Sequence, residues 1–196
     1  GRNIVLDSSG NSFAAAVTMK AGAAGGDTFG NITFIDNAAV DFDSSATANG
    51  DLYINASTDG AVGGNLSVTA TGNITQNIAL AVTGTTTLAA GTSNDITLDN
   101  ASNNFQGAVL VTTARDINLV NSGAINLGNT TVSGTYAVTA TTGDITDSGT
   151  LTITGASVFT TRVGGSNIVL DSSANAFAAA VTMKADTAGD ETFGNI

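Results

Sequence analysis

The sequence predicts an all-β protein that folds as a right-handed parallel β-helix (a β-solenoid) of about eight coils, each 20–28 residues long. Three observations carry this prediction. Short runs alternate apolar and polar residues at a period of two, the runs recur about every 23 residues, and Gly, Asn, Asp and Ser separate them. The expected hand is right, because crossovers between parallel strands of one sheet are right-handed in nearly all proteins.

The repeat is visible first at long range. Residues 1–32 align with residues 165–196 without a gap, and 25 of these 32 positions are identical. We therefore expect residues 1–164 to be one super-repeat of seven β-helix coils and residues 165–196 to be the start of the next super-repeat. On this reading the sequence is a window cut from a longer array.

A shorter unit recurs inside the super-repeat, and each copy opens with an Asn or Asp followed by an aliphatic residue. The openers are Asn3, Asn31, Asp51, Asn73, Asp95, Asp116, Asp144 and Asn167. Asn and Asp fit the corners of a coil, cap turn backbone and can hydrogen-bond to stacked neighbours, so a structural role is expected for them.

The aliphatic residues that follow the openers should point inward and stack from coil to coil. One continuous stack is expected from Ile4, Ile32, Leu52, Ile74, Ile96, Ile117, Ile145 and Ile168. A second stack two residues later should contain Leu6, Phe34, Ile54, Leu98 and Leu119, with interruptions at Gln76 and Asp147.

Two other structures fit the sequence less well. The Ala-rich segment 12–24 is the best helix candidate, but segment 103–113 fills the same place in the repeat with Gly and β-branched residues, which favours a strand. An antiparallel sandwich would need recurring two-residue hairpin turns. The pairs Asn49-Gly50 and Asp59-Gly60 do not recur at the repeat spacing.

The amino-acid composition limits the classes of partner that the chain is expected to bind. The chain of 196 residues is 42% hydrophobic and 11% charged, and it has no Pro, Cys, His or Trp. Its formal net charge is −11 and its five basic residues are scattered, so no nucleic-acid partner is expected. No apolar run approaches the ~18–20 residues of a membrane helix, so we expect no membrane span in this segment.

The segment "NDITLDNASNNFQGAVLVTTARDINLVNSGAINLGNTTVSGTYAVTATTGDITDSGTLTITG" (94–155) resembles the repetitive shaft of filamentous-haemagglutinin-like bacterial surface proteins. The resemblance covers most of the chain and includes the phrase Asn-x-Phe-x-Gly-Ala-Val at 103–109, with variants at 11–17 and 175–181. It implies a right-handed β-helix shaft, export by two-partner secretion, an extracellular location at the bacterial cell surface, and roles in adhesion, aggregation or biofilm. The near-identical super-repeat departs from the irregular shafts of that family.

Carboxylates are the groups from which a chemical site could be built. Asp95, Asp99 and Asp116 would lie near one another and are the candidates for calcium, the weak cofactor alternative. The acidic residues are spread over corners and do not form a dedicated loop, so we expect no metal and no cofactor. The pairs Asp41/Asp43 and Asp144/Asp147 have no His, Trp or clustered Lys and Arg to complete a site, so we expect no catalytic residues and no enzyme.

The sequence thus predicts a structural shaft segment of an extracellular bacterial adhesin or cell-surface fibre that mediates adhesion, aggregation or biofilm contact. A carbohydrate- or ice-binding β-solenoid is the alternative, raised by the Thr-rich runs 83–87, 138–142 and 151–155. The expected partners are neighbouring repeats, identical chains end to end, and glycans or proteins on host or neighbouring cells. Six Asn-x-Ser/Thr sequons leave glycosylation open: Asn31, Asn55, Asn65, Asn73, Asn100 and Asn129.

Overall fold

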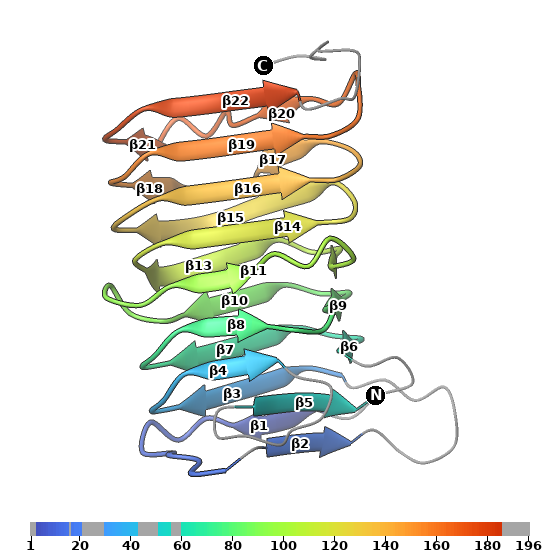
Figure 1. Ribbon diagram of the computed structural model, residues 1–196, viewed down its shortest axis with the longest axis vertical. Coiled ribbons are helices and arrows are strands. Elements are labelled where there is room, and N and C mark those ends of the chain that lie inside the picture. Colours follow the sequence, from blue (N-terminus) through green and yellow to red (C-terminus); the bar gives the residue numbers. More distant parts are fainter. Residues whose placement is uncertain (1–2, 16, 21–29, 43–50, 56–59, 186–196) are drawn as a thin grey trace.

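The structure is a computed structural model that describes residues 3–15, 17–20, 30–42, 51–55 and 60–185. All secondary-structure elements formed by these residues are β-strands, and all paired strands are parallel. Figure 1 shows the near strands running one way and the far strands the other while the chain rises, which makes the coil right-handed. The predicted right-handed parallel β-helix is confirmed.

Three parallel sheets wrap one core. The first sheet contains β1 (Ile4–Leu6), β3 (Ile32–Asp36), β7 (Leu66–Ala70), β10 (Thr86–Ala89), β13 (Val109–Ala114), β15 (Ile125–Val132), β17 (Ile145–Asp147), β18 (Leu151–Ile153), β20 (Ile168–Val169) and β21 (Ala176–Phe177). The second sheet contains β2 (Val17–Lys20), β4 (Val40–Phe42), β5 (Asp51–Asn55), β8 (Ile74–Gln76), β11 (Ile96–Leu98), β14 (Ile117–Asn121), β16 (Tyr136–Ala140), β19 (Ser157–Thr161) and β22 (Val181–Ala185). The third, short sheet contains β6 (Ala61–Val62), β9 (Ala81–Val82) and β12 (Asn104–Phe105).

The turns are regular from β7 upward. Six successive turns each place one strand in the first sheet and the next in the second, from β7 and β8 to β21 and β22. The residues in register along the second sheet are Ile74, Ile96, Ile117, Tyr136, Ser157 and Val181, so one turn takes 19–24 residues. Strands β1 and β3 extend the first sheet below these six turns.

The lower part of the second sheet departs from chain order. Strand β5 lies between β2 and β4, although it follows both in the sequence (Figure 1). Its Leu52 pairs with Val17 on one side and with Phe42 on the other. The chain therefore steps back one level after β4. Within the helix candidate 12–24, residues Val17–Lys20 form strand β2, and residues 16 and 21–24 lie outside the described residues.

The prediction of one continuous aliphatic stack is wrong, because its members lie in two different sheets. Ile4 pairs with Ile32 in the first sheet, whereas Ile74, Ile96 and Ile117 are in register in the second. The remaining members split as well, because Ile145 pairs with Ile168 back in the first sheet, and Leu52 belongs to the backward step of β5. An Asn or Asp followed by an aliphatic residue occurs at the start of strands in both sheets. The spacing of this pattern along the sequence therefore does not reveal to which sheet a strand belongs.

The second predicted stack divides in the same way. Leu6 pairs with Phe34 in the first sheet and Leu98 with Leu119 in the second. Ile54 pairs with Met19 below the level of β4. Each pairing is still between two apolar residues, so the alternation of apolar and polar residues predicts the inward side correctly but not the connection between levels.

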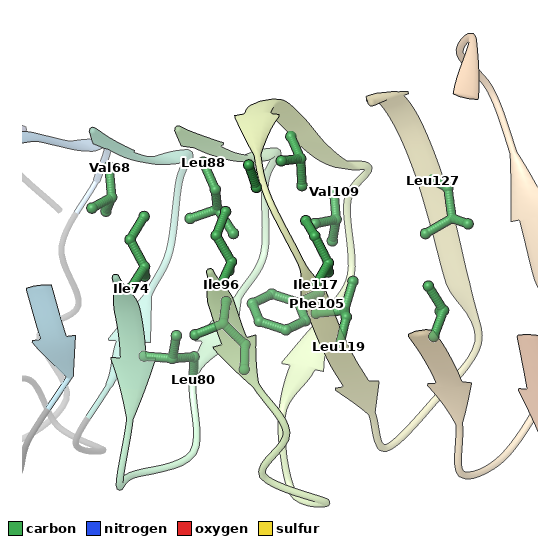
Figure 2. Packing of buried hydrophobic residues seen from close by; sticks show 14 of the residues in the cluster. Val68, Ile74, Leu80, Leu88, Ile96, Phe105, Val109, Ile117, Leu119 and Leu127 are labelled. Atoms are coloured by element: carbon green, nitrogen blue, oxygen red, sulfur yellow. The ribbon is translucent and has the colours of Figure 1, made fainter. Parts of the chain in front are cut away.

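The core is one column of apolar side chains. Figure 2 shows Ile74, Ile96 and Ile117 from the second sheet opposite residues of the first, with Leu80 and Phe105 filling the third side. All five are at most 3% exposed. Burying one such side chain contributes about 1.5–3 kcal/mol relative to leaving it in water. In the part of the chain that the structure describes, no helix is long and apolar enough to span a membrane.

Candidate functional site

Asparagine side chains connect successive coils at the corner that precedes the first sheet. The Oδ1 of Asn3 accepts the backbone N–H of Asn31 at 2.9 Å, and the Oδ1 of Asn31 accepts that of Asn65 at 2.8 Å. Asn65 repeats the contact with the N–H of Thr85 at 2.8 Å. Each amide satisfies a corner N–H and fixes the height of the next coil.

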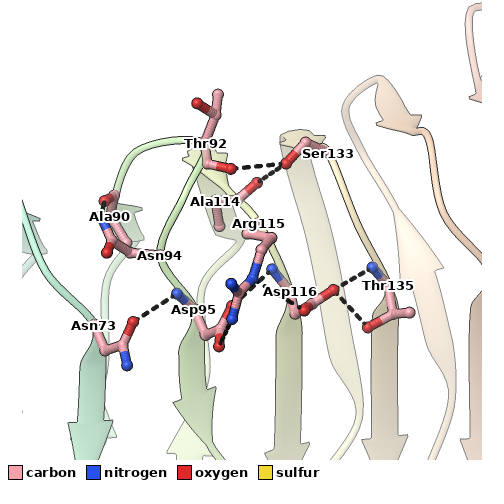
Figure 3. Close-up of polar contacts among 10 residues, drawn as sticks. All are labelled: Asn73, Ala90, Thr92, Asn94, Asp95, Ala114, Arg115, Asp116, Ser133 and Thr135. Atoms are coloured by element: carbon pink, nitrogen blue, oxygen red, sulfur yellow. Dashed lines mark hydrogen bonds and ion pairs between the residues drawn. The ribbon is translucent and has the colours of Figure 1, made fainter.

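A second ladder of the same kind precedes the second sheet (Figure 3). The Oδ1 of Asn73 accepts the N–H of Asp95 at 3.0 Å, and the Oδ1 of Asp95 accepts that of Asp116 at 3.3 Å. The Oδ1 of Asp116 accepts the N–H of Thr135 at 2.6 Å. The predicted capping and axial bonding of the Asx openers is confirmed at these corners, but the openers form separate ladders.

Two further steps occur at other corners. The Oδ1 of Asn129 accepts the N–H of Thr150 at 2.9 Å, and the Oδ1 of Asp144 accepts that of Asn167 at 2.7 Å. The side chain of Asp51 lies outside the described residues. Acidic and amide side chains thus do the same work, because each presents an oxygen to a backbone N–H one coil further on.

Glycine precedes several of the ladder residues, and its missing side chain is required there. A Cβ on Gly84 would lie 2.2 Å from the Oδ1 of Asn65, and one on Gly134 would lie 2.2 Å from the Oδ1 of Asp116. Real Cβ atoms do not approach so closely, so glycine makes room for the side chain that rises from the coil below. The sequence signal of this corner unit, which was not recognised above, is a Gly-Asn or Gly-Thr pair at the corner, as at 64–65, 84–85, 134–135 and 149–150.

Arg115 lies between the carboxylates considered for calcium. Its Nε donates to the Oδ1 of Asp95 at 2.8 Å, its second guanidinium nitrogen donates to the Oδ2 of Asp95, and its Nε lies 3.3 Å from the Oδ2 of Asp116 (Figure 3). The hydrogen bond and charge of Asp95 raise the pKa of Arg115. The positive charge of Arg115 therefore lies between the two negative charges of Asp95 and Asp116 and offsets their mutual repulsion.

The pKa of Asp116 is lowered, and Thr135 is the main cause. The backbone N–H of Thr135 donates to Asp116, its hydroxyl donates to the same oxygen at 2.9 Å, and the charge of Arg115 adds a smaller effect. Asp99, the third calcium candidate, accepts a hydrogen bond from the side chain of Asn118 at 3.3 Å. Within the described ranges, no three acidic side chains form a group that could hold a metal ion.

The carboxylate pairs considered for catalysis are placed as follows. Asp41 accepts the hydroxyl of Thr75 at 2.9 Å, and Asp43 lies outside the described residues. Asp144 bonds to Asn167, as described above. Asp147 accepts the N–H of Asp171 at 3.0 Å, so both members of this pair bond to the coil above.

A fully buried asparagine, Asn103, joins three coils. Its Nδ2 donates to the carbonyl oxygen of Leu98 at 3.1 Å, to that of Val120 at 3.2 Å and to the Oε1 of Gln76 at 2.8 Å. Its Oδ1 accepts the N–H of Leu80 at 2.9 Å and the Nε2 of Gln76 at 2.8 Å. Every hydrogen-bonding position of this amide is used, which is what a buried polar side chain requires.

The loop that carries Asn103 occurs three times, with the sequences "LDSSGNSF" (6–13), "LDNASNNF" (98–105) and "LDSSANAF" (170–177). In the first and third copies, Asn11 and Asn175 also donate to the carbonyl oxygen of the leucine five residues earlier, at 3.2 and 3.4 Å. Below the third loop, Asp147 takes the place of Gln76 and accepts the Nδ2 of Asn175 at 2.6 Å. Gln76 and Asp147, the two interruptions of the second predicted stack, are therefore the residues that receive these loops.

Buried polar residues also receive the loops from above. The Oδ1 of Asp36 accepts the N–H of Phe13 at 3.1 Å, and the Oδ1 of Asn121 accepts that of Phe105 at 2.8 Å. Asp36 and Asn121 are 2% and 1% exposed. The Asn-x-Phe phrase is visible in the sequence, but a buried position for its asparagine is not expected from sequence alone, because Asn is common in exposed turns.

The outward Thr residues of the first sheet form short ladders. Thr33, Ser67 and Thr87 are in register on the first sheet, and the next residue in that row is Leu110. Thr86, from the run at 83–87, points inward and is fully buried. The Thr-rich runs therefore do not share one position from coil to coil.

A protein-family profile described as "Repeats of unknown function (DUF5649)" matches residues 29–112 and 114–184. The two matches correspond in structure. Each contains, in its first turn, a buried receptor above a loop (Asp36 or Asn121), and each ends inside the strand that follows the next loop (β13 or β22). The comparison with curated proteins and the comparison with solved structures found no match to this chain.

Proposed function

Because this chain belongs to the DUF5649 family of repeats of unknown function, we propose a role for it as a structural array. Specifically, we propose that it is a shaft segment of an extracellular bacterial adhesin or cell-surface fibre, similar to filamentous-haemagglutinin-like proteins, and that it supports adhesion, aggregation or biofilm contact. The observation that carries the proposal is the direction of the polar contacts, which run from one coil to the next along the axis.

The carboxylates illustrate this direction. Asp95, Asp116 and Asp144 each accept a backbone N–H of the following coil. A binding or catalytic site gathers polar groups around one point where a ligand can reach them. Groups that bond to the neighbouring coil instead specify the stacking, which supports a role in building length.

Repetition makes length adjustable. Each added coil extends the solenoid by about 4.8 Å, so a seven-coil unit adds roughly 34 Å. The coil contacts are local, so units can be added or lost without redesign of the rest. The net charge of −11 on the segment opposes lateral collapse of neighbouring shafts.

The test uses cells that produce the complete protein. An antibody against the purified chain should label intact cells, and prior absorption with the chain should abolish the labelling. Labelling that appears only after permeabilisation would overturn the surface location. The same cells then provide a test of the shaft role, by in-frame removal of one 164-residue unit at the identical positions 3 and 167, which preserves the coil register.

Removal of a unit should shorten the fibre in electron micrographs and lower adhesion to a surface. The matched control keeps the 164-residue unit but permutes the positions of its outward-facing residues. The length of the fibre is then unchanged, while the pattern of side chains on its surface differs. A shaft predicts normal adhesion for this control. Loss of adhesion in the control with no loss on shortening would overturn the shaft role.

A further inference from the structure

Each Asn-x-Ser/Thr sequon whose asparagine side chain the structure describes leaves the nitrogen of that side chain free. In every such sequon the Oδ1 accepts a backbone N–H, and among the described residues the Nδ2 has no hydrogen-bond partner. The asparagines are Asn31, Asn65, Asn73, Asn100 and Asn129. The side chain of Asn55, which begins the remaining sequon, lies outside the described residues.

Asparagines that use the side-chain nitrogen lie elsewhere in the sequence. In the described part of the chain, every asparagine whose Nδ2 donates a hydrogen bond is outside a sequon. Examples are Asn11, Asn94, Asn103, Asn118, Asn121 and Asn175. A composition rich in Asn, Ser and Thr accounts for the number of sequons, but it does not account for this division between free and bonded nitrogens.

All of these sequon asparagines except Asn100 are the exposed corner residues of the ladders described above. Asn31, Asn65 and Asn73 immediately precede β3, β7 and β8, and Asn129 lies in β15. Their Oδ1 atoms hold the next coil at distances from 2.8 to 3.0 Å. A substituent on Nδ2 would leave these bonds intact, because the oxygen makes the contact.

The hydroxyl residue of the sequon lies on the outward side of its strand. Ile32 and Leu66 are fully buried, so the alternation along a strand turns Thr33 and Ser67 outward, and these two are in register on β3 and β7. An asparagine followed two residues later by Ser or Thr is the acceptor signal for N-linked glycosylation. Both side chains of this signal are therefore at the surface of the solenoid.

We propose that Asn31, Asn65, Asn73 and Asn129 carry N-linked sugars. The donor is a sugar whose anomeric carbon bears a diphosphate leaving group. A bond forms between that carbon and Nδ2, while the bond from the carbon to the diphosphate oxygen breaks and the diphosphate leaves with the electron pair. Nδ2 transfers one of its two protons to a base of the glycosyltransferase and keeps the other. The amide oxygen gains no new bond and still accepts the N–H of the next coil.

The sheets determine when the sugar is added. Strand β7 pairs with β3 on one side and with β10 on the other, so the backbone of the Asn65 sequon is enclosed in the folded chain. A glycosyltransferase has to bind this backbone, so addition precedes stacking of the coil. The Asn100 sequon differs, because its Oδ1 bonds to the N–H of Ser102 at 2.9 Å within an exposed turn. That sequon stays accessible on the folded protein.

Mass spectrometry of the complete protein from the cells that produce it tests the assignment. Peptides with the four ladder sequons should carry a sugar. The peptide with Asn3 should not, since Asn3 makes the same corner contact but has Val5 in place of the hydroxyl residue. Single-sugar increments would indicate a nucleoside diphosphate donor and one constant oligosaccharide a lipid diphosphate donor, and either supports the proposal. Unmodified peptides at all four positions, or sugar on Asn100 alone, would overturn it and leave the shaft role unaffected.

Variants at one corner separate the sugar from the coil contact. Asn65→Asp keeps an oxygen for the N–H of Thr85, as Asp116 does for Thr135, but it has no Nδ2. It should lose the sugar, and without sugar its melting temperature should match that of the unmodified wild-type chain. Ser67→Ala should lose the sugar too, whereas Asn65→Ala should lose the sugar and melt at a lower temperature. Equal destabilisation by Asn65→Asp and Asn65→Ala, or a sugar that persists in Ser67→Ala, would overturn the assignment.

A gain of modification completes the test. Val5→Thr creates a sequon at Asn3, an exposed ladder residue whose Nδ2 has no partner among the described residues. Val5 is 57% exposed, so the exchange leaves the core unchanged. The variant should acquire a sugar on Asn3, and the control Val5→Ala should not. An unmodified Asn3 in Val5→Thr would overturn the link between the ladder corner and the acceptor site.

Discussion

The backbone N–H of Leu80 donates to the Oδ1 of Asn103 at 2.9 Å, across 23 residues of sequence and between two adjacent turns. The same asparagine also contacts the turn above through Val120. A shift of one residue between any two of these turns would leave buried donors and acceptors unpaired, at a cost of about 1–3 kcal/mol for each group. Asn103 therefore helps to specify the register of three coils.

Replacing Asn103 by leucine should be strongly destabilising. The apolar side chain removes the partners of Leu80, Leu98 and Gln76 while these groups stay buried, and we expect a loss of more than about 3 kcal/mol. The control is Asn104→Ala, because the side chain of Asn104 is exposed. Urea unfolding of both variants measures the difference. Similar midpoints would show that the amide network contributes little.

Gly84→Ala should also destabilise the protein. The added methyl group would meet the Oδ1 of Asn65 and the carbonyl oxygen of Gly64, 2.7 Å away, and the strands must move apart, at a cost of about 1–3 kcal/mol. Gly123→Ala is the matched control, since its Cβ would meet only the Nδ2 of Asn121 at 4.0 Å. Thermal melts of the two variants check this. A Gly84→Ala variant as stable as the control would contradict the corner geometry.

Ile96→Asp should unfold or severely weaken the middle of the solenoid. Ile96 is 1% exposed and lies between Ile74 and Ile117, so the new carboxylate would be buried without a partner, at a cost of several kcal/mol. The adjacent Thr97 points outward, and Thr97→Asp should change the melting temperature much less. Equal effects at the two positions would mean that the stack is assigned to the wrong side of the strand.

Stability should fall in acid partly through Asp116. Because its pKa is lowered on folding, the carboxylate stabilises the protein above its unfolded pKa of about 3.9, and this contribution is lost as the pH falls through the folded pKa. Asp116→Asn should therefore melt with less pH dependence below about pH 5. Arg115→Met should reduce the dependence only in part, since Thr135 is the main cause of the shift. Identical pH profiles for Asp116→Asn and wild-type protein would refute this account.

Calcium should change stability little. Both carboxylate oxygens of Asp95 already accept hydrogen bonds from Arg115, and Ca²⁺ requires six to eight oxygen ligands. Melting curves in EDTA and in millimolar Ca²⁺ should coincide. A calcium-dependent rise in melting temperature that disappears in Asp95→Asn would instead identify a site around Asp95, Asp99 and Asp116.

The fold class could be predicted because its signals are local. Alternation at period two, frequent turn residues and a repeat near 20 residues are all visible without knowledge of contacts. The neighbours of Ile96 were predicted correctly for the same reason, since Ile74, Ile96 and Ile117 lie on consecutive regular turns. The corner role of Asn and Asp followed from their side-chain chemistry.

The assignment of strands to faces could not be predicted by the same means. Strand β5 has the Asx-aliphatic pattern of its neighbours, yet it steps back between β2 and β4. The position of Arg115 against Asp95 depends on the register of two coils, which no single segment contains. Asn103 and Asn104 are adjacent and chemically identical, and only the path of the loop decides that the first is buried.

The strands of this solenoid lie across its axis, so the hydrogen bonds between coils lie along it. Tension applied to the two ends of the chain therefore pulls directly on these bonds and loads the terminal coil first. Such a coil should detach by itself, and the coils behind it should stay folded until their turn comes. The turn from Ile96 to Ile117 spans 21 residues, which would lengthen the chain by roughly 65–70 Å on release. An array of many coils would then yield in small steps under load and could rewind when the load falls.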